Sequence, residues 1–232
     1  MHDLASPSRH EDAVGIVLAG GRSRRLAPSG LGPGGKAAII IAGESLLGRI
    51  CRVVGGVVSR VIVVAAQGQP LPGLPARVEV VRDSTPEAGP TAGLCDGLRQ
   101  ARDVDQQGVS PRVAFVTSCD APLLSTAVVR LLLEIAREPG VRLVVPIVGG
   151  HPQVLVSAVA LDLVEMIAAE AAAGNGLRAM IGRLQESQPS AVRLVASGDV
   201  VQVDPDLESF FDIDTPEDLA RLHARGIPSS RG

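Results

Sequence analysis

Aromatic side chains are almost absent from this chain of 232 residues, which has three Phe and neither Trp nor Tyr. Its core must therefore be built from aliphatic residues, and a hydrophobic content of 46% is enough for a sizeable one. Single-stranded nucleic acids commonly stack on aromatic rings, and nucleic-acid binding in general needs a basic surface. Because the formal net charge is −3, we predict that nucleic acid is not a partner.

Long apolar runs and paired cysteines are missing as well. No run approaches the roughly 18 residues that a transmembrane helix needs, and the polar segment 1–12 lacks the apolar centre of a signal peptide. The three cysteines form no C-x-x-C pair, which favours neither a zinc site nor a disulfide framework. We therefore expect a cytoplasmic protein without membrane contact, with a disordered tail at 1–12, one domain at 13–225 and a C-terminal tail at 226–232.

Short β-branched runs alternate with longer amphipathic stretches. The expected strands are 13–19, 60–66, 77–81, 112–117 and 141–148, with two more at 153–159 and 191–196. The expected helices are 44–59, 89–103, 125–138, 161–174, 176–186 and 215–226. This alternation predicts an α/β fold with right-handed crossovers and a mostly parallel sheet that helices cover on both faces. In such sheets, ligands bind where the strands end, so we expect the functional residues in the loops that follow the strands.

Two glycine-rich runs compete as a phosphate site. The run "GLGPGGKA", which includes Lys36, nearly matches a P-loop. However, Ala37 stands where a Ser or Thr should hold magnesium, and a β-like run follows instead of a helix. The run "GGRSRR" follows the first strand directly. Backbone N–H groups of Gly20 and Gly21 can face an anion there, and Arg25 with its neighbouring arginines can bind phosphate oxygens. We therefore favour the earlier run.

Lys36 is the only lysine, because all other basic side chains of the 22 Lys+Arg are arginines. A lysine is a compact point charge that fits between two phosphates, where a planar guanidinium is bulkier. The sequence therefore suggests that this position requires an ammonium group.

Carboxylates follow several expected strands. Asp120 comes directly after one, and a lone strand-end carboxylate suits Mg²⁺, which binds one or two carboxylates together with substrate phosphates. Asp83 follows another strand and is open to two interpretations, a ligand contact or an Asx turn. Asp212 and Asp214 could bind a metal, approach an acceptor substrate, or serve as turn and cap residues. His151, the only histidine expected within the body of the fold, could be structural.

Taken in order, the motifs "LAGGRSRR", Lys36, "DSTPEAGPTAGL", "CDAPLL", "HPQ" and "FDIDTPEDL" resemble those of the molybdenum cofactor guanylyltransferases. The resemblance runs from about residue 14 to 222. It implies a Rossmann-like three-layer α/β/α sandwich. It also implies transfer of GMP from GTP to the phosphate of molybdopterin, with release of pyrophosphate. Mg²⁺ would be the cofactor, and proteins of molybdoenzyme maturation would be transient partners.

The resemblance also implies roles for matching positions. The backbones of Leu18, Ala19 and Gly20 would contact the nucleotide. Gly21 and Arg25 would line its phosphates, which Lys36 would neutralise. Asp83 would lie near the guanine and ribose, and Asp120 would hold Mg²⁺. Residues on the acceptor side would be His151, Asp212 and Asp214.

Some positions depart from the family pattern. The loop before Lys36 is longer than usual, and the family's Asn-x-Asn motif is replaced by Asp212 and Asp214, whose charges would repel a phosphorylated acceptor unless a metal intervenes. The alternatives that stay open are a related enzyme with another base or acceptor, such as a molybdopterin cytidylyltransferase, a nucleotide-binding module without catalysis, and a P-loop NTPase. The sequence leaves the oligomeric state open.

Overall fold

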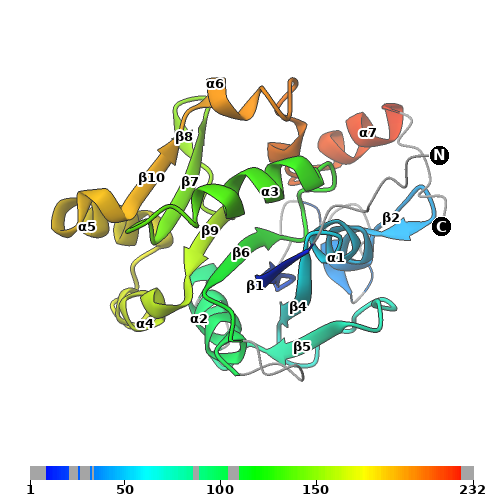
Figure 1. Cartoon of the computed structure of the whole chain (residues 1–232). Coiled ribbons are helices and arrows are strands. Elements are labelled where there is room, and N and C mark those ends of the chain that lie inside the picture. Colours follow the sequence, from blue (N-terminus) through cyan, green and yellow to red (C-terminus); the bar gives the residue numbers. More distant parts are fainter. Residues whose placement is uncertain are drawn as a thin grey trace, which may run out of the picture.

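The computed structural model describes residues 9–20, 26, 32, 34–85, 89–103 and 110–225 of the chain. Within them, the central element is an eight-stranded sheet with the order β10-β7-β9-β6-β1-β4-β5, and β8 pairs with β7 (Figure 1). All pairs are parallel except those of β9 with β6 and β7 and that of β8 with β7. The predicted α/β class and mostly parallel sheet are confirmed.

The strands of this sheet are β1 (His10–Leu18), β4 (Val58–Ala65), β5 (Val78–Arg82), β6 (Val113–Ser118), β7 (Leu143–Val148), β8 (His151–Pro152), β9 (Val156–Ala160) and β10 (Val192–Val195). A separate hairpin joins β2 (Ile40–Ile41) and β3 (Glu44–Ser45). The α-helices are α1 (Leu46–Gly55), α2 (Pro90–Ala101), α3 (Thr126–Ile135), α4 (Val164–Ala172), α5 (Leu177–Ser187), α6 (Ser197–Val200) and α7 (Pro216–Ala224). Single turns of 3-10 helix are η2 (Gly35–Ala38), η3 (Leu161–Leu163), η4 (Pro189–Ala191) and η5 (Glu208–Phe210).

One expectation, the start of the first strand, needs correction. The first strand begins at His10, whose backbone N–H donates to the carbonyl of Val57 at 2.7 Å, so residues 10–12 are part of the sheet and not of a tail. β9 was expected as one more strand of a mostly parallel sheet, and it runs antiparallel to both of its neighbours. Hydrophobic patterning locates a strand but does not give its direction, because the direction depends on the length and path of the connections.

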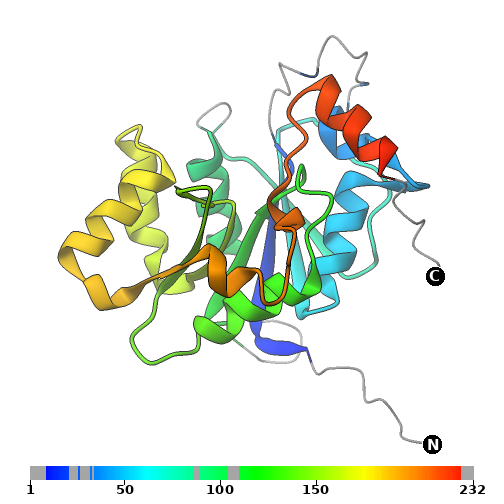
Figure 2. The same cartoon turned by 90° about the horizontal axis from the view of Figure 1, so that it is seen from above.

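Helices cover both faces of the sheet (Figure 1). One apolar cluster joins α1 and α3 to one face, and another joins α2, α4 and α5 to the other. Strand β1 contributes alternate side chains to the two clusters, Val17 to the first and Ile16 to the second. Figure 2 shows α4 and α5, in yellow and orange, at one end of the molecule and α7, in red, at the other.

The N-cap residues predicted for two helices are confirmed. Ser125 caps α3 by accepting from the N–H of Val128, and Thr215 opens α7 with Pro216 in its first turn. Among the described residues, no helix has the length and apolar character to cross a membrane.

Helix α1 packs unusually close to β1 at Gly15. A Cβ atom at this glycine would lie 2.3 Å from Cγ1 of Val54 on α1, which is far inside the van der Waals distance. Since the strand is buried on both faces, neither element can move aside without disturbing the core.

We expect Gly15→Ala to lower the free energy of unfolding by about 1–3 kcal/mol, the usual cost of an overpacked core. Gly182→Ala is the matched control, because a Cβ there, on α5, meets nothing within 4 Å. Urea unfolding followed by circular dichroism measures both. Shortening the clashing neighbour in Gly15→Ala/Val54→Ala should make the effect of the alanine smaller, and strictly additive losses would contradict this explanation.

Candidate functional site

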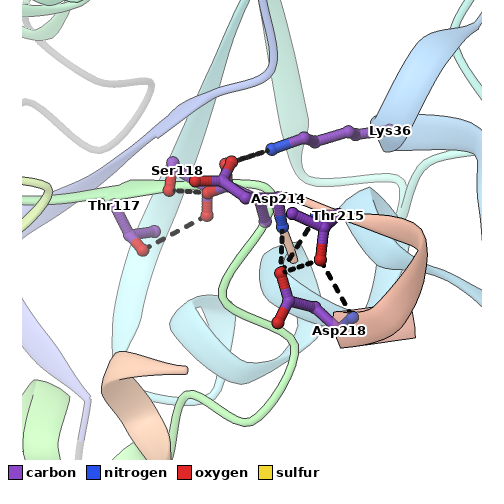
Figure 3. Close-up of polar contacts among 7 residues, drawn as sticks. Lys36, Thr117, Ser118, Asp214, Thr215 and Asp218 are labelled. Carbon is purple, nitrogen blue, oxygen red and sulfur yellow. Dashed lines mark hydrogen bonds and ion pairs between the residues drawn. The ribbon is translucent and has the colours of Figure 1, made fainter. Parts of the chain in front are cut away.

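Lys36 forms an ion cluster with two carboxylates from distant parts of the chain. Its Nζ donates to Oδ1 of Asp214 at 2.7 Å and to Oδ2 of Asp120 at 3.1 Å. Figure 3 shows the Lys36 and Asp214 side chains pointing toward one another from different elements. The lysine side chain is only 12% exposed, so its ammonium group is largely removed from water and depends on these partners for its stabilisation.

The lysine is presented by η2, one turn of 3-10 helix. Gly35 is the first residue of this turn and has a φ of +61°. Ala37, which follows Lys36, is fully buried against α1. The turn ends at Ile39, which is extended. A P-loop would continue into an α-helix at this point. The local structure therefore does not support the P-loop alternative.

Asp120 is positioned by the end of β6. Its Oδ1 accepts a short hydrogen bond from the hydroxyl of Ser118, and its backbone carbonyl accepts from the N–H of Ile213 at 2.9 Å. The first contact orients the carboxylate, and the second joins the β6 loop to the segment that carries Asp214. Ser118 was not predicted as a site residue, although a hydroxyl two residues before a strand-end carboxylate is a recognisable signal.

Asp214 is held just before α7. The Asp218 carboxylate accepts from the backbone N–H groups of Asp214 and Thr215 at 3.2 and 3.0 Å, and the Thr215 hydroxyl accepts from the N–H of Asp218 (Figure 3). This capping box fixes the entry into the helix. A third apolar cluster, which includes the buried Ile213 and Leu222, anchors the helix beside the site.

The charges of the cluster reinforce one another. Burial by itself would lower the pKa of Lys36. The hydrogen bonds and charges of Asp214 and Asp120 outweigh this effect, so the pKa of Lys36 is raised. Asp212 lies nearby and retains an exposed face. Partial removal from water and the neighbouring charges of Asp120 and Asp214 raise the pKa of Asp212 to about 7. The site is therefore a concentration of negative charge that contains one strong cation.

The predicted nucleotide contacts Leu18, Ala19 and Gly20 lie at the carboxyl end of β1. The backbone carbonyl of Leu18 accepts from Cys119 N–H at 3.0 Å, next to Asp120, and Ala19 N–H donates to Val64 on β4 at 2.8 Å. β1 lies between β4 and β6, where the strand order reverses, and open α/β sheets bind ligands at such a switch point. Gly21 and Arg25, also predicted as phosphate contacts, lie outside the described residues.

Two other predicted residues lie apart from the ion cluster. Asp83 follows β5, two strands from β1, and its Oδ1 accepts from Thr85 N–H at 3.0 Å, which is the Asx turn that the sequence left open. His151 is exposed on β8, next to the carboxyl end of β7. Both lie where strands of the sheet end, Asp83 after β5 and His151 beside the end of β7, whereas Asp120 follows β6.

Sequence reasoning missed Gln69, in the loop after β4. Its side-chain amide donates to the carbonyls of Ala19 and Gly34 at 3.1 and 3.3 Å. Nothing in the sequence "QGQ" of this loop indicates that its second glutamine reaches the end of β1.

The described residues contain no group of three or more His, Cys, Asp and Glu side chains arranged to hold a metal ion. Mg²⁺ differs from most protein-bound metals in needing only one or two carboxylates when substrate phosphates complete its ligands. Asp120 and Asp214 already share one cation, the Lys36 ammonium. The donor set thus fits a divalent cation that arrives with a polyphosphate.

An open α/β sheet with a partly buried cation and carboxylates at its switch point is typical of an enzyme that binds phosphorylated ligands. Comparison with known proteins narrows the class. Residues 15–207 match the family described as the MobA-like NTP transferase domain. A probable molybdenum cofactor guanylyltransferase of Mycobacterium ulcerans is 36% identical over 172 residues, 72% of this chain and 79% of the relative. Another, from Mycobacterium tuberculosis, is 34% identical over 185 residues, 78% of this chain and 83% of the relative.

Solved structures share the fold. The molybdopterin-guanine dinucleotide biosynthesis protein A of Archaeoglobus fulgidus superposes with a TM-score of 0.71 at 19% identity, covering 91% of this chain and 97% of its own. The 2-C-methyl-D-erythritol 4-phosphate cytidylyltransferase of Thermus thermophilus reaches 0.63 at 19% identity, covering 92% and 98%. The chain is a nucleotidyltransferase with a Rossmann-like fold, and it belongs to the MobA-like NTP transferase family. The predicted resemblance is confirmed. The family match ends before Asp212 and Asp214.

The raised pKa of Asp212 makes a prediction about stability. The folded chain binds this proton more tightly than the unfolded chain, in which a carboxyl pKa is about 3.9. The stabilisation is therefore complete below about pH 4 and is lost as the pH rises toward 7. We expect Asp212→Asn to be more stable than the wild type at pH 8, by a margin that grows between pH 5 and 7 and is constant above.

Urea unfolding with EDTA present, at pH values from 5 to 8, measures this margin. Because the charge of Asp120 is one cause of the shift, the margin should shrink when both proteins also carry Asp120→Asn. Stability curves that stay parallel across this pH range would contradict the assignment.

Proposed function

We propose that this protein transfers GMP from GTP to the phosphate of molybdopterin and releases pyrophosphate. The observation that carries the proposal is the placement of the only lysine, paired with Asp120 and Asp214, beside the carboxyl ends of β1 and β6. This is the edge at which a Rossmann-like sheet binds a nucleotide. The names of the curated relatives supply the guanylyl group and the molybdenum cofactor.

The nucleotide would bind at the end of β1. Backbone groups of Leu18, Ala19 and Gly20 would contact it, and Gly20 is exposed where the strand ends. Gly21 and Arg25 would line the phosphates, as the sequence predicts. The Lys36 ammonium lies on the β6 side of this edge and would neutralise phosphate oxygens, for which a compact charge is better suited than a guanidinium.

The reaction needs charge neutralisation and alignment more than proton transfer. An oxygen of the acceptor phosphate attacks the α-phosphorus of GTP and forms a new P–O bond, while the bond from the α-phosphorus to the bridging oxygen breaks and its electron pair leaves with pyrophosphate. The attacking phosphate is already ionised, so no general base is required. Lys36 would stabilise the negative charge that shifts to the leaving group, and the backbone at β1 would hold the reactants in line.

Asp120 and Asp214 would hold a divalent cation, Mg²⁺ as predicted, which would supply Lewis-acid stabilisation of the phosphates when bound. Without it, the Lys36 ammonium neutralises the same two carboxylates. This arrangement supports the interpretation of Asp214 as a member of the cation site. It also neutralises one of the two carboxylates, Asp214, that would otherwise repel an anionic acceptor.

The acceptor would approach from the side of Asp212 and Asp214, with His151 farther along the same edge. The alternative is a related nucleotidyltransferase with another base or acceptor, and the likeness in fold to a cytidylyltransferase keeps this option testable. Buried, free Cys51, Cys95 and Cys119 fit the cytoplasmic location that the sequence predicts. Transient contact with molybdoenzyme maturation proteins is part of the same proposal.

We expect Lys36→Ala and Asp120→Ala each to lower the rate of pyrophosphate release by roughly 10²–10³, the usual cost of losing a group that stabilises developing charge. The assay supplies GTP, Mg²⁺ and molybdopterin. Arg193→Ala is the matched control for loss of a cation. Arg193 lies on the edge strand β10, where its side chain pairs with Glu138. Near-wild-type rates in both site variants would contradict the proposed mechanism.

Base selectivity can be tested without the acceptor. A ligand that binds only the folded state raises the melting temperature, and at equal concentration the ligand that binds more tightly raises it more. We expect GTP with Mg²⁺ to raise it more than CTP, UTP or ATP at equal concentration. A larger shift with CTP would favour the cytidylyltransferase alternative, and a GTP-selective shift without pyrophosphate release would indicate a binding module without catalysis.

A further inference from the structure

The Gln69 side chain links the two segments that form the proposed triphosphate site. Its Nε2 donates to the carbonyl of Ala19 at 3.1 Å and to the carbonyl of Gly34 at 3.3 Å. Ala19 is where β1 gives way to the glycine run, and Gly34 is the residue before η2, which carries Lys36. One amide group therefore uses both of its donors on the backbone of the two segments.

The loop that carries Gln69 is itself well ordered by hydrogen bonds. Gly68 has φ of +67°, which turns the chain so that the N–H of Gln69 donates to the carbonyl of Ala66 at 3.1 Å. The side-chain Oε1 of Gln69 accepts from the N–H of Ala66, also at 3.1 Å. Arg82 then donates to the carbonyls of Ala66 and Gln69 at 3.0 and 2.9 Å. The glutamine amide is held at its oxygen and is not free to rotate away.

The Gly34 side of the contact is equally close. Gly34 is buried, and a Cβ atom there would lie 3.3 Å from the carbonyl oxygen of Pro70 and 2.6 Å from Cβ of Ala38. The loop after β4 therefore presses against the turn that precedes Lys36, and the amide of Gln69 spans the remaining distance to β1. Lys36 is two residues from Gly34, within a turn whose other support is the buried Ala37.

We propose that Gln69 is a positioning residue for the nucleotide. It sets the distance between the end of β1 and the turn that presents Lys36, and so holds the ammonium in place relative to the phosphates. The assignment rests on the proposed function for its ligand, a nucleoside triphosphate, but the structural link from Gln69 to Lys36 can be tested with no nucleotide present. A neutral carboxamide suits the task because it donates twice and adds no charge beside the phosphates.

The solitary lysine makes the test specific. Protein grown with [15N]lysine contains one labelled backbone amide, that of Lys36. Gln69→Met keeps the length of the side chain and removes both donors and the acceptor. We expect it to move or split the Lys36 amide resonance while the circular dichroism spectrum is unchanged. Gln202→Met is the control, because Gln202 is exposed and its amide also donates to a backbone carbonyl, that of Gly198.

Activity measurements ask whether the link matters for the reaction. A displacement of about 1 Å near a reacting centre can cost a hundredfold in rate, so we expect Gln69→Met to lower kcat/KM for GTP by about tenfold to a hundredfold. If Gln69 acts through Lys36, then Gln69→Met should cause little further loss in the Lys36→Ala background. Loss of stability alone would lower activity in both backgrounds and leave the Lys36 resonance in place.

An unchanged Lys36 resonance in Gln69→Met would overturn the proposal, as would full and independent losses in the double variant. Should Gln69→Met not fold, Gln69→Glu is the second variant, because it keeps the acceptor for Ala66 N–H and removes only the donors. The position of the Lys36 amide resonance in Gln69→Glu then tests the proposal in the same way. If the wild type releases no pyrophosphate from any nucleotide, the proposed function fails, while the resonance still shows whether Gln69 positions Lys36.

Discussion

The ammonium group of Lys36, placed between the carboxylates of Asp120 and Asp214, is the interaction on which the site depends. Each of these charges would be costly in its position without the others, because all three side chains are partly withdrawn from water. Together they connect η2, the β6 loop and the segment before α7. In the sequence, Lys36 is 84 residues from Asp120 and 178 residues from Asp214.

The sheet explains why these segments meet. Strands β1, β4, β5 and β6 run in one direction, so their following loops lie along one edge, and the strand order reverses at β1. Gly20, Gln69, Asp83 and Asp120 each lie in a loop that follows one of these strands. The other edge carries the amino ends of these strands. Parallel pairing, enforced by the crossover helices, therefore concentrates polar groups that the sequence scatters.

The fold is compatible with more than one chemistry. A molybdopterin-guanine dinucleotide biosynthesis protein and a cytidylyltransferase both superpose on this chain, each at 19% identity, so the fold alone does not set the base or the acceptor. The family match ends at residue 207, so Asp212 and Asp214 lie in a segment that the match does not cover. The capping box at Thr215 fixes the start of α7 directly after that segment.

Local sequence patterns predicted the α/β class, the caps Ser125 and Thr215, and the candidate roles of Lys36 and Asp120. They could do so because strand alternation, capping and strand-end charges are features of residues close together in the sequence. They could not give the direction of β9 or the start of β1 at His10, which depend on pairing with distant strands. They also could not separate the two interpretations of Asp83, or reveal that Gln69 reaches both Ala19 and Gly34. A hydrogen bond across 35 or 50 residues has no local signature, because the folded chain alone brings its donor and acceptor together.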